Sequence, residues 1–321
     1  MKDAFYPNTR AGPEKRKKAM RSLLSSFNTP FALDLALTLA RWLPPRLGLP
    51  LSRLIADIVS GMQRTDLVQA VRLNQWVLGQ GRLSARQLNE AVRNTVRSAA
   101  CCLYDLYHNL DNLAAVRQRI ELTPTVHEMI ERVRTGRLGQ IIVTPHLSNF
   151  DLVTLATASK ELNLLLLTFP HPDSGYQRQN QVRSFTGLQV LPTSKTALRR
   201  AIEHLRNGGS VITALDRPIP ESRYRLRFFG RPAHLPVHHI LLALKANVPI
   251  TVCAVTTQNC GTYTVSASEP IEMQRLPNRQ QEITVNAEKV LSVAENFVRQ
   301  APQQWRMFYP VWPEAESELP L

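Results

Sequence analysis

Apolar residues recur at helical spacing through the first third of this 321-residue chain. Ser84 and Gln87 form a capping-box pattern, and apolar residues then follow every three or four positions across 88–106. A second, shorter pattern over 123–136 opens with a threonine and a proline and stops at a glycine. We therefore expect a helical N-terminal portion over residues 28–120, with one further helix behind it.

The pattern changes after residue 139, where short β-branched and apolar runs alternate with helical segments. Strand-like runs occupy 140–144, 163–169, 211–215, 249–256 and 263–268, and helical patterns occupy 195–207 and 283–298. Strands that alternate with helices of this length are typical of an α/β fold. We predict a central mixed, largely parallel sheet flanked by helices over residues 121–313, followed by an acidic tail over 314–321.

Composition adds a constraint on partners. The apolar fraction of 44% is that of a globular protein, but the net charge of +14 is unusually basic. Such a charge favours contact with nucleic acid, a phospholipid surface or phosphorylated substrates. No zinc finger or ribonucleoprotein motif accompanies the charge, so we expect no nucleic-acid partner and keep nucleic-acid binding as the weaker alternative. Residues 1–27 are polar and basic, and we expect them to form a flexible leader without a signal-peptide core.

Membrane contact without a membrane span is the expectation for the N-terminal portion. No run approaches the twenty apolar residues that a spanning helix needs. The segment 30–59 mixes large apolar residues with prolines and arginines, which suits helices lying in a membrane interface. A helical hairpin packed on the core explains the same pattern. The four cysteines form no CxxC cluster, so we expect a reducing, cytosolic setting and no metal site.

The segment around His146 and Asp151 combines local order with reactive groups. A strand-like run ends at Thr144, Pro145 turns the chain, and Ser148 or Asn149 could cap a helix that begins near residue 150. On one continuous helix the five-residue spacing would splay the histidine and aspartate by roughly 140°. They can meet only across a strand–turn–helix junction, where the aspartate would accept the Nδ1 proton and leave Nε2 as a general base. A structural histidine in a loop is the plain alternative.

The run 141–151 resembles the HX4D motif of glycerolipid-type acyltransferases, and the order of later motifs resembles the branch with lipid A late acyltransferases and phosphatidylinositol mannoside acyltransferases. The motifs that carry this resemblance lie between residues 30 and 313 and read Ser148-Asn149-Phe150-Asp151, Leu205-Arg206-Asn207-Gly208-Gly209, Ala214-Leu215-Asp216-Arg217-Pro218, Phe229-Gly230-Arg231-Pro232-Ala233 and Pro302-Gln303-Gln304-Trp305. Many members of that family have Gly-Asn-Trp-Glu where this chain has Ser-Asn-Phe-Asp. The difference bears on how closely the histidine and the acid engage.

The resemblance implies an O-acyltransferase. His146 would deprotonate a hydroxyl of a lipid or glycolipid acceptor, which attacks the thioester of acyl-CoA or acyl carrier protein. Asp151 would orient the histidine, and Asp216 would be a second acidic residue near the site. No bound cofactor is expected, because the acyl thioester is a co-substrate. A GxSxG elbow is absent from the sequence, which argues against a serine lipid hydrolase.

The resemblance also indicates substrate-binding residues and a location. The residues assigned to substrate binding are Ser148, Asn149, Arg178, Asn180, Arg217, Gly230, Arg231 and Pro232. Arginine forks in the segment 217–231 suit the phosphates of CoA, phosphopantetheine or a lipid head group. We expect a peripheral or monotopic protein on anionic lipid at the cytoplasmic face of the inner membrane. A catalytically inactive, lipid-binding homologue remains an alternative function.

Overall fold

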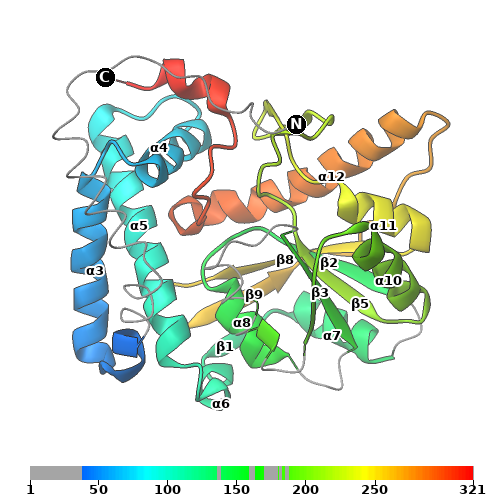
Figure 1. The fold of residues 1–321 in the computed structure, drawn as a ribbon, viewed down its shortest axis with the longest axis horizontal. Coiled ribbons are helices and arrows are strands. Elements are labelled where there is room, and N and C mark those ends of the chain that lie inside the picture. Colours follow the sequence, from blue (N-terminus) through cyan, green and yellow to red (C-terminus); the bar gives the residue numbers. More distant parts are fainter. Residues whose placement is uncertain are drawn as a thin grey trace, which may run out of the picture.

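A seven-stranded sheet forms the centre of the computed structural model, which describes residues 38–135, 139–158, 163–169, 180, 183–184 and 188–320 (Figure 1). Across the sheet the strands are ordered β1 (Ile120–Leu122), β9 (Tyr263–Ala267), β8 (Ile250–Thr256), β2 (Gln140–Thr144), β5 (Ser210–Ala214), β3 (Leu164–Thr168) and β4 (Gln189–Pro192). All neighbouring strands are parallel except β8 and β9. The predicted mixed, largely parallel sheet is confirmed.

Helices cover both faces of this sheet, as expected for parallel strands that are buried on two sides. One face carries α10 (Lys195–Arg206), α11 (His238–Ala246) and α12 (Arg279–Gln300), and the other carries α6 (Leu113–Arg117), α7 (Pro124–Thr135) and α8 (Phe150–Thr157). Side chains alternate between the faces along each strand. In β2, Ile141 and Val143 therefore pack in the core under α10 to α12, whereas Ile142 packs in the core under α7 and α8.

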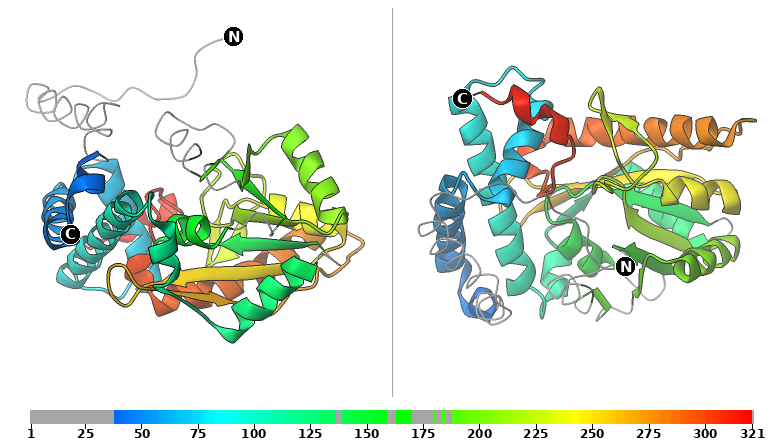
Figure 2. Two further views of the ribbon diagram at one scale, coloured as in Figure 1. Left: turned by 90° about the horizontal axis from the view of Figure 1, so that it is seen from below. Right: turned by 45° about the horizontal axis from the view of Figure 1, so that its top comes forward.

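The predicted helical N-terminal portion is confirmed as α3 (Pro45–Gly61), α4 (Asp66–Leu78) and α5 (Ala85–His108), which stand at one end of the sheet (Figures 1 and 2). Helix α5 begins with the predicted capping box, in which Ser84 accepts from the Gln87 backbone and Gln87 accepts from the Ser84 backbone. Four apolar residues of α4 and α5 (Val68, Val71, Val92 and Val96) form a small separate core with Ala56 of α3.

The C-terminal segment returns across these helices and ties them to the sheet. It contains the 3-10 turns η1 (Pro302–Gln304) and η2 (Pro313–Glu318). Asn74 of α4 is buried, donates to the carbonyls of Met307 and Tyr309, and accepts from the Val311 amide at 3.1 Å. A buried side-chain amide that satisfies three backbone groups fixes the path of a segment that lacks regular structure.

A small hairpin of β6 (Leu226–Phe228) and β7 (Arg231–Ala233) carries the Phe-Gly-Arg-Pro-Ala block. Phe229 and Gly230 form its turn with φ values of +50° and +76°, the left-handed backbone that tight hairpins require. The acidic residues expected in a tail pack against this hairpin, since Arg231 makes a bidentate ion pair with Glu318 at 2.6 Å.

The predicted strands and helices from residue 124 to 300 are present with ends shifted by a few residues. The expected flexible leader over 1–27, the first part of the segment 30–59 and the glycine stop at 136 lie outside the described residues. None of the helices that the structure describes is both long and apolar enough to cross a membrane.

Candidate active site

The segment 144–151 forms the strand–turn–helix junction that the sequence predicted. Strand β2 ends at Thr144 and helix α8 begins at Phe150. The turn between them is held by the C-terminal segment, because the Ser148 amide donates to the Gln304 carbonyl at 2.9 Å and the Arg306 amide donates to the His146 carbonyl at 2.8 Å. The backbone of His146 is thus fixed from both sides of its turn.

His146 is oriented by Asp216, which corrects the prediction that Asp151 performs this role. His146 Nδ1 lies 2.6 Å from Asp216 Oδ1, and the His146 backbone amide donates to Oδ2 of the same carboxylate at 2.8 Å. Trp305 Nε1 donates to Oδ2 as well, at 2.7 Å. The physical reason lies in the sheet, where Thr144 at the end of β2 pairs with Ala214 at the end of β5. His146 lies two residues beyond the end of β2 and Asp216 lies two residues beyond the end of β5, so their side chains meet.

Asp151 contacts arginines instead of Nδ1. Arg183 Nε and Nη2 both donate to Asp151 Oδ1, at 3.0 and 2.6 Å, and Arg306 Nη2 lies 4.0 Å from Oδ2. Asp151 and Arg183 are both buried, so this ion pair is well shielded from water. The aspartate of the HX4D segment therefore holds two cationic side chains beside the histidine.

Both aspartates stay ionised despite their burial. Burial raises the pKa of Asp216, but the charge of His146 and the hydrogen bonds from His146 and Trp305 outweigh it, so the pKa lies below its usual range. Burial likewise raises the pKa of Asp151, and the charges of Arg183 and Arg306 more than offset that effect. The site therefore contains two carboxylates, one paired with an imidazole and one with guanidinium groups.

A cavity of about 160 Å³ opens beside the His146 ring. Its lining residues are His146, Phe150, Asp151, Arg183, Arg217, Arg306, Met307, Phe308 and Tyr309. Phe150 packs edge-on against the His146 ring, with 5.2 Å between centroids, and its face meets the Arg306 guanidinium at 5.2 Å. The cavity thus joins an imidazole, aromatic rings and three arginines.

A second pocket continues from the same residues between the ends of three strands. It has a volume of about 40 Å³ and extends past Thr144, Thr168 and Ala214, which end β2, β3 and β5. Its remaining walls are largely apolar, with Leu155, Leu166, Leu167 and Ile212. A crevice at the carboxyl ends of parallel strands is the usual ligand site of open α/β sheets.

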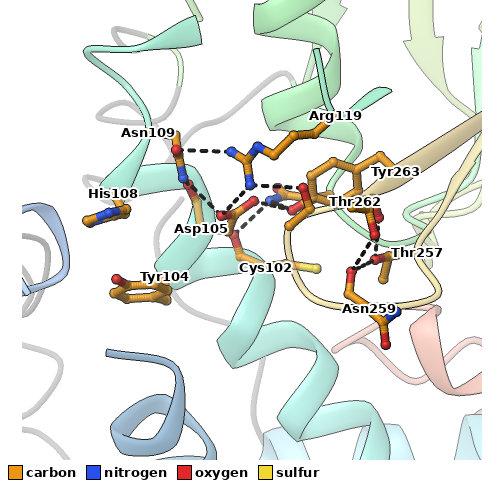
Figure 3. Close-up of polar contacts among 12 residues, drawn as sticks. Cys102, Tyr104, Asp105, His108, Asn109, Arg119, Thr257, Asn259, Thr262 and Tyr263 are labelled. Carbon is orange, nitrogen blue, oxygen red and sulfur yellow. Dashed lines mark hydrogen bonds and ion pairs between the residues drawn. The ribbon is translucent and has the colours of Figure 1, made fainter. Parts of the chain in front are cut away.

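Ser148 and Asn149, which were predicted to contact substrate, are both fully enclosed. Asn149 Nδ2 donates to the Cys102 carbonyl of α5 at 2.9 Å and to the Tyr263 hydroxyl of β9 at 3.0 Å. Figure 3 shows these two partners in the polar network between α5 and β9. Asn149 therefore anchors the start of α8, and Ser148 takes the left-handed φ of +47° that the turn needs.

The other predicted binding residues differ in where they lie. Arg217 lines the cavity, stacks on Phe169 and Tyr309 at 3.8 and 4.2 Å, and donates to the Tyr309 hydroxyl. Asn180 lies near the site, because its Oδ1 accepts from Arg183 at 3.0 Å. Arg178 lies outside the described residues.

Gly230, Arg231 and Pro232, which the resemblance assigned to substrate binding, line neither pocket beside His146. Arg231 is engaged by Glu318 instead. The hairpin that carries this block still reaches the site, through the residue that precedes the block. Phe228 is fully buried and packs edge-on against Trp305, 6.0 Å between centroids, and Trp305 in turn holds Asp216.

Sequence reasoning assigned no role to Arg183, Arg306 or Trp305. Trp305 belongs to the Pro-x-Gln-Trp ending and Arg306 follows it directly, so the motif signalled a constraint without revealing its partner. Arg183 lies three residues beyond Asn180, a spacing that places both on one side of a helical turn. That spacing was the available signal for Arg183.

Comparison with known proteins identifies two relatives and a family. The chain is similar to two phosphatidylinositol mannoside acyltransferases from Mycobacterium tuberculosis, strains CDC 1551 / Oshkosh and ATCC 25618 / H37Rv, each with 27% identity over 125 residues. That match covers 35% of this chain and 37% of each relative, just over a third of their length. The profile of the family described as "Bacterial lipid A biosynthesis acyltransferase" matches residues 15–314. The chain belongs to the bacterial lipid A biosynthesis acyltransferase family.

Proposed function

We propose that this protein transfers a fatty acyl group from an acyl thioester to a hydroxyl of a membrane lipid or glycolipid, with His146 as general base. The observation that supports this most is the His146–Asp216 pair at the edge of a cavity that three arginines line. A carboxylate on Nδ1 holds the ring proton there and leaves Nε2 to accept a proton. Membership of an acyltransferase family supports the reaction class.

The reaction then has two steps, addition to the thioester and collapse of the intermediate. Nε2 of His146 takes the proton of the acceptor hydroxyl while its oxygen attacks the thioester carbonyl, which gives a tetrahedral oxyanion. The oxyanion collapses, the carbon–sulfur bond breaks, and the leaving thiolate takes the proton back from the imidazolium. Asp216 stabilises the imidazolium between these steps, as its buried, ionised state allows.

The cationic side chains supply charge at the same place. Arg183 and Arg306 line the cavity and are held by Asp151, while Arg217 is held by aromatic stacking. Guanidinium groups in a site partly shielded from water can stabilise a developing oxyanion. They can also bind the phosphates of CoA, of a carrier's phosphopantetheine or of a lipid. In our proposal Asp151 acts through these arginines rather than through His146.

An exposed apolar face on α3 supports association with a membrane surface. Leu47, Leu51, Leu54, Ile55 and Ile58 are between 41% and 61% exposed. At about 100° per residue they fall within an arc of about 100°, opposite the buried Ala56. Such a stripe, next to exposed arginines in a chain with a net charge of +14, suits an interfacial helix on anionic lipid. We propose a peripheral position at the cytoplasmic face of the inner membrane.

Thiol release from palmitoyl-CoA and from palmitoylated acyl carrier protein, with lipid extracts as acceptor, tests the reaction. We expect His146→Ala to abolish transfer and the exposed His127→Ala on α7 to leave it unchanged. The preferred thioester identifies the donor. Full transfer by His146→Ala would refute the mechanism. A wild-type protein that binds vesicles but transfers nothing would favour the inactive, lipid-binding homologue, and tight DNA binding at physiological salt would favour the nucleic-acid alternative.

A further inference from the structure

Two cysteines and an arginine meet away from the His146 cavity, where α3, α5 and the β8–β9 turn come together. Cys101 of α5 and Cys260 of the turn line a groove of about 710 Å³ with Arg53 of α3. Both thiols are free, and each shifts the pKa of the other. Cys101 is buried, whereas Cys260 is partly exposed to the groove. The segments that supply them are far apart in sequence.

The two thiols are chemically unequal, and a guanidinium lies beside the more exposed one. Its Nη2 lies 3.8 Å from Cys260 Sγ, and Ser52 Oγ lies 4.0 Å from Cys101 Sγ. The neighbouring Cys101 thiol lowers the pKa of Cys260, burial opposes this, and Arg53 lowers it further. The Cys260 thiol in turn raises the pKa of Cys101, and burial raises it as well. A thiolate beside a guanidinium is the form of cysteine that attacks electrophiles.

The other two cysteines provide an internal contrast. Cys102 is buried, and burial raises the pKa of its thiol. Burial also raises the pKa of Cys253 to about 12. Neither residue lines the groove. A groove lined by one accessible, activated thiol and by a second, buried thiol has the arrangement of an attacking and a resolving cysteine.

We propose that Cys260 and Cys101 form a redox-active dithiol that reacts with hydroperoxides. The Cys260 thiolate attacks the terminal OH oxygen of the hydroperoxide and the O–O bond breaks. The products are a sulfenic acid and an alkoxide, or hydroxide when the oxidant is hydrogen peroxide. The Cys101 thiol then attacks the sulfenic sulfur, which forms the Cys101–Cys260 disulfide and releases water. The two cysteines are oxidised by two electrons in total, and the peroxide is reduced. The disulfide covalently joins α5 to the β8–β9 turn.

The test uses the full chain, reduced and freed of reductant, with hydrogen peroxide as oxidant and N-ethylmaleimide as quench. Peptide mass spectrometry should find the Cys101–Cys260 disulfide as the main product, formed at least tenfold more slowly in Arg53→Gln. In Cys101→Ser, dimedone should trap a sulfenic acid on Cys260. Cys260→Ser should prevent oxidation of Cys101, and the matched control Cys253→Ser should behave as wild type.

Alkylation of the wild-type protein keeps the proposal testable if a variant folds poorly. Iodoacetamide should modify Cys260 with a pH midpoint below about 8.5, the value of an ordinary thiol, and should modify Cys253 only at far higher pH. Oxidation of Cys102 or Cys253 as fast as Cys260 would overturn the proposal. So would a Cys260 midpoint at or above that of an ordinary thiol, or a dominant disulfide between two chains.

Discussion

Replacement of Asp216 by asparagine removes one charge and one acceptor from the centre of the candidate site. The carboxylate accepts three hydrogen bonds, from His146 Nδ1 on Oδ1 and from the His146 amide and Trp305 Nε1 on Oδ2. An asparagine has one acceptor oxygen, so only one of these two positions can keep its role.

The asparagine oxygen should occupy the Oδ2 position. The opposite orientation would leave two buried N–H donors facing an NH₂ group, at about 1–3 kcal/mol for each unsatisfied donor. With the oxygen at Oδ2, the NH₂ group faces His146 Nδ1 and donates to it. The ring proton then moves to Nε2, which can no longer accept the proton of a hydroxyl.

We therefore expect Asp216→Asn to lower kcat for acyl transfer by about 10⁴, by analogy with the orienting aspartate of serine proteases. That factor corresponds to about 5 kcal/mol of transition-state stabilisation. Thiol release reports kcat, and ¹⁵N NMR of labelled histidine reports the tautomer without any substrate. Glu282→Gln, a buried acid at the start of α12, serves as the matched control.

A variant that kept more than a tenth of the wild-type kcat would refute the reasoning. An Nδ1-protonated His146 ring in that variant would refute it as well, whatever the activity.

Three further predictions concern the neighbouring charge, the membrane face and acid stability. Asp151→Asn leaves its buried arginine partners without a counter-ion, so we expect urea unfolding to show a loss of about 3 kcal/mol in the free energy of unfolding. We also expect kinetics to show a raised KM, and an unchanged KM would contradict the proposed role of Asp151. Leu54→Asp with Ile58→Asp replaces two half-exposed residues of α3, each of which contributes about 1 kcal/mol to membrane binding. The affinity for anionic vesicles, measured by sedimentation, should fall at least about thirtyfold. The control Val285→Asp, at an exposed position of α12, should have no effect. Burial lowers the pKa of His238 from 6.5 to about 4, so the unfolded chain binds the extra proton first. The contribution of His238 to the free energy of unfolding is complete above pH 6.5 and falls by about 3 kcal/mol as the pH drops to 4. The same loss in a His238→Gln variant would disprove this assignment.

Local patterns in the sequence predicted the elements well because each is governed by near neighbours. The capping box at Ser84 and Gln87, the strand that ends at Thr144 and the helix that begins near residue 150 all depend on spacing within a few residues. The order of five short motifs also located His146 in a candidate site. These features required no knowledge of how distant segments meet.

The partner of His146 was a matter of tertiary structure. Asp151 is near it in sequence, but it lies on the first turn of α8 and contacts Arg183, 32 residues away. Asp216 is 70 residues distant and reaches Nδ1 because β2 and β5 pair in parallel with their ends aligned. Strand register is a property of the assembled sheet, which spacing along the chain does not encode.

The sequence by itself determined the fold class, the candidate histidine and the family resemblance. The tertiary structure alone decided which groups are available for chemistry. In the folded chain Ser148 and Asn149 are buried, Arg231 pairs with Glu318, and Trp305 donates a hydrogen bond to Asp216. The physical reason is the same in each case, since burial and ion pairing depend on contacts between segments that are far apart in the chain, whereas helix and strand periodicity depends on residues that are close together.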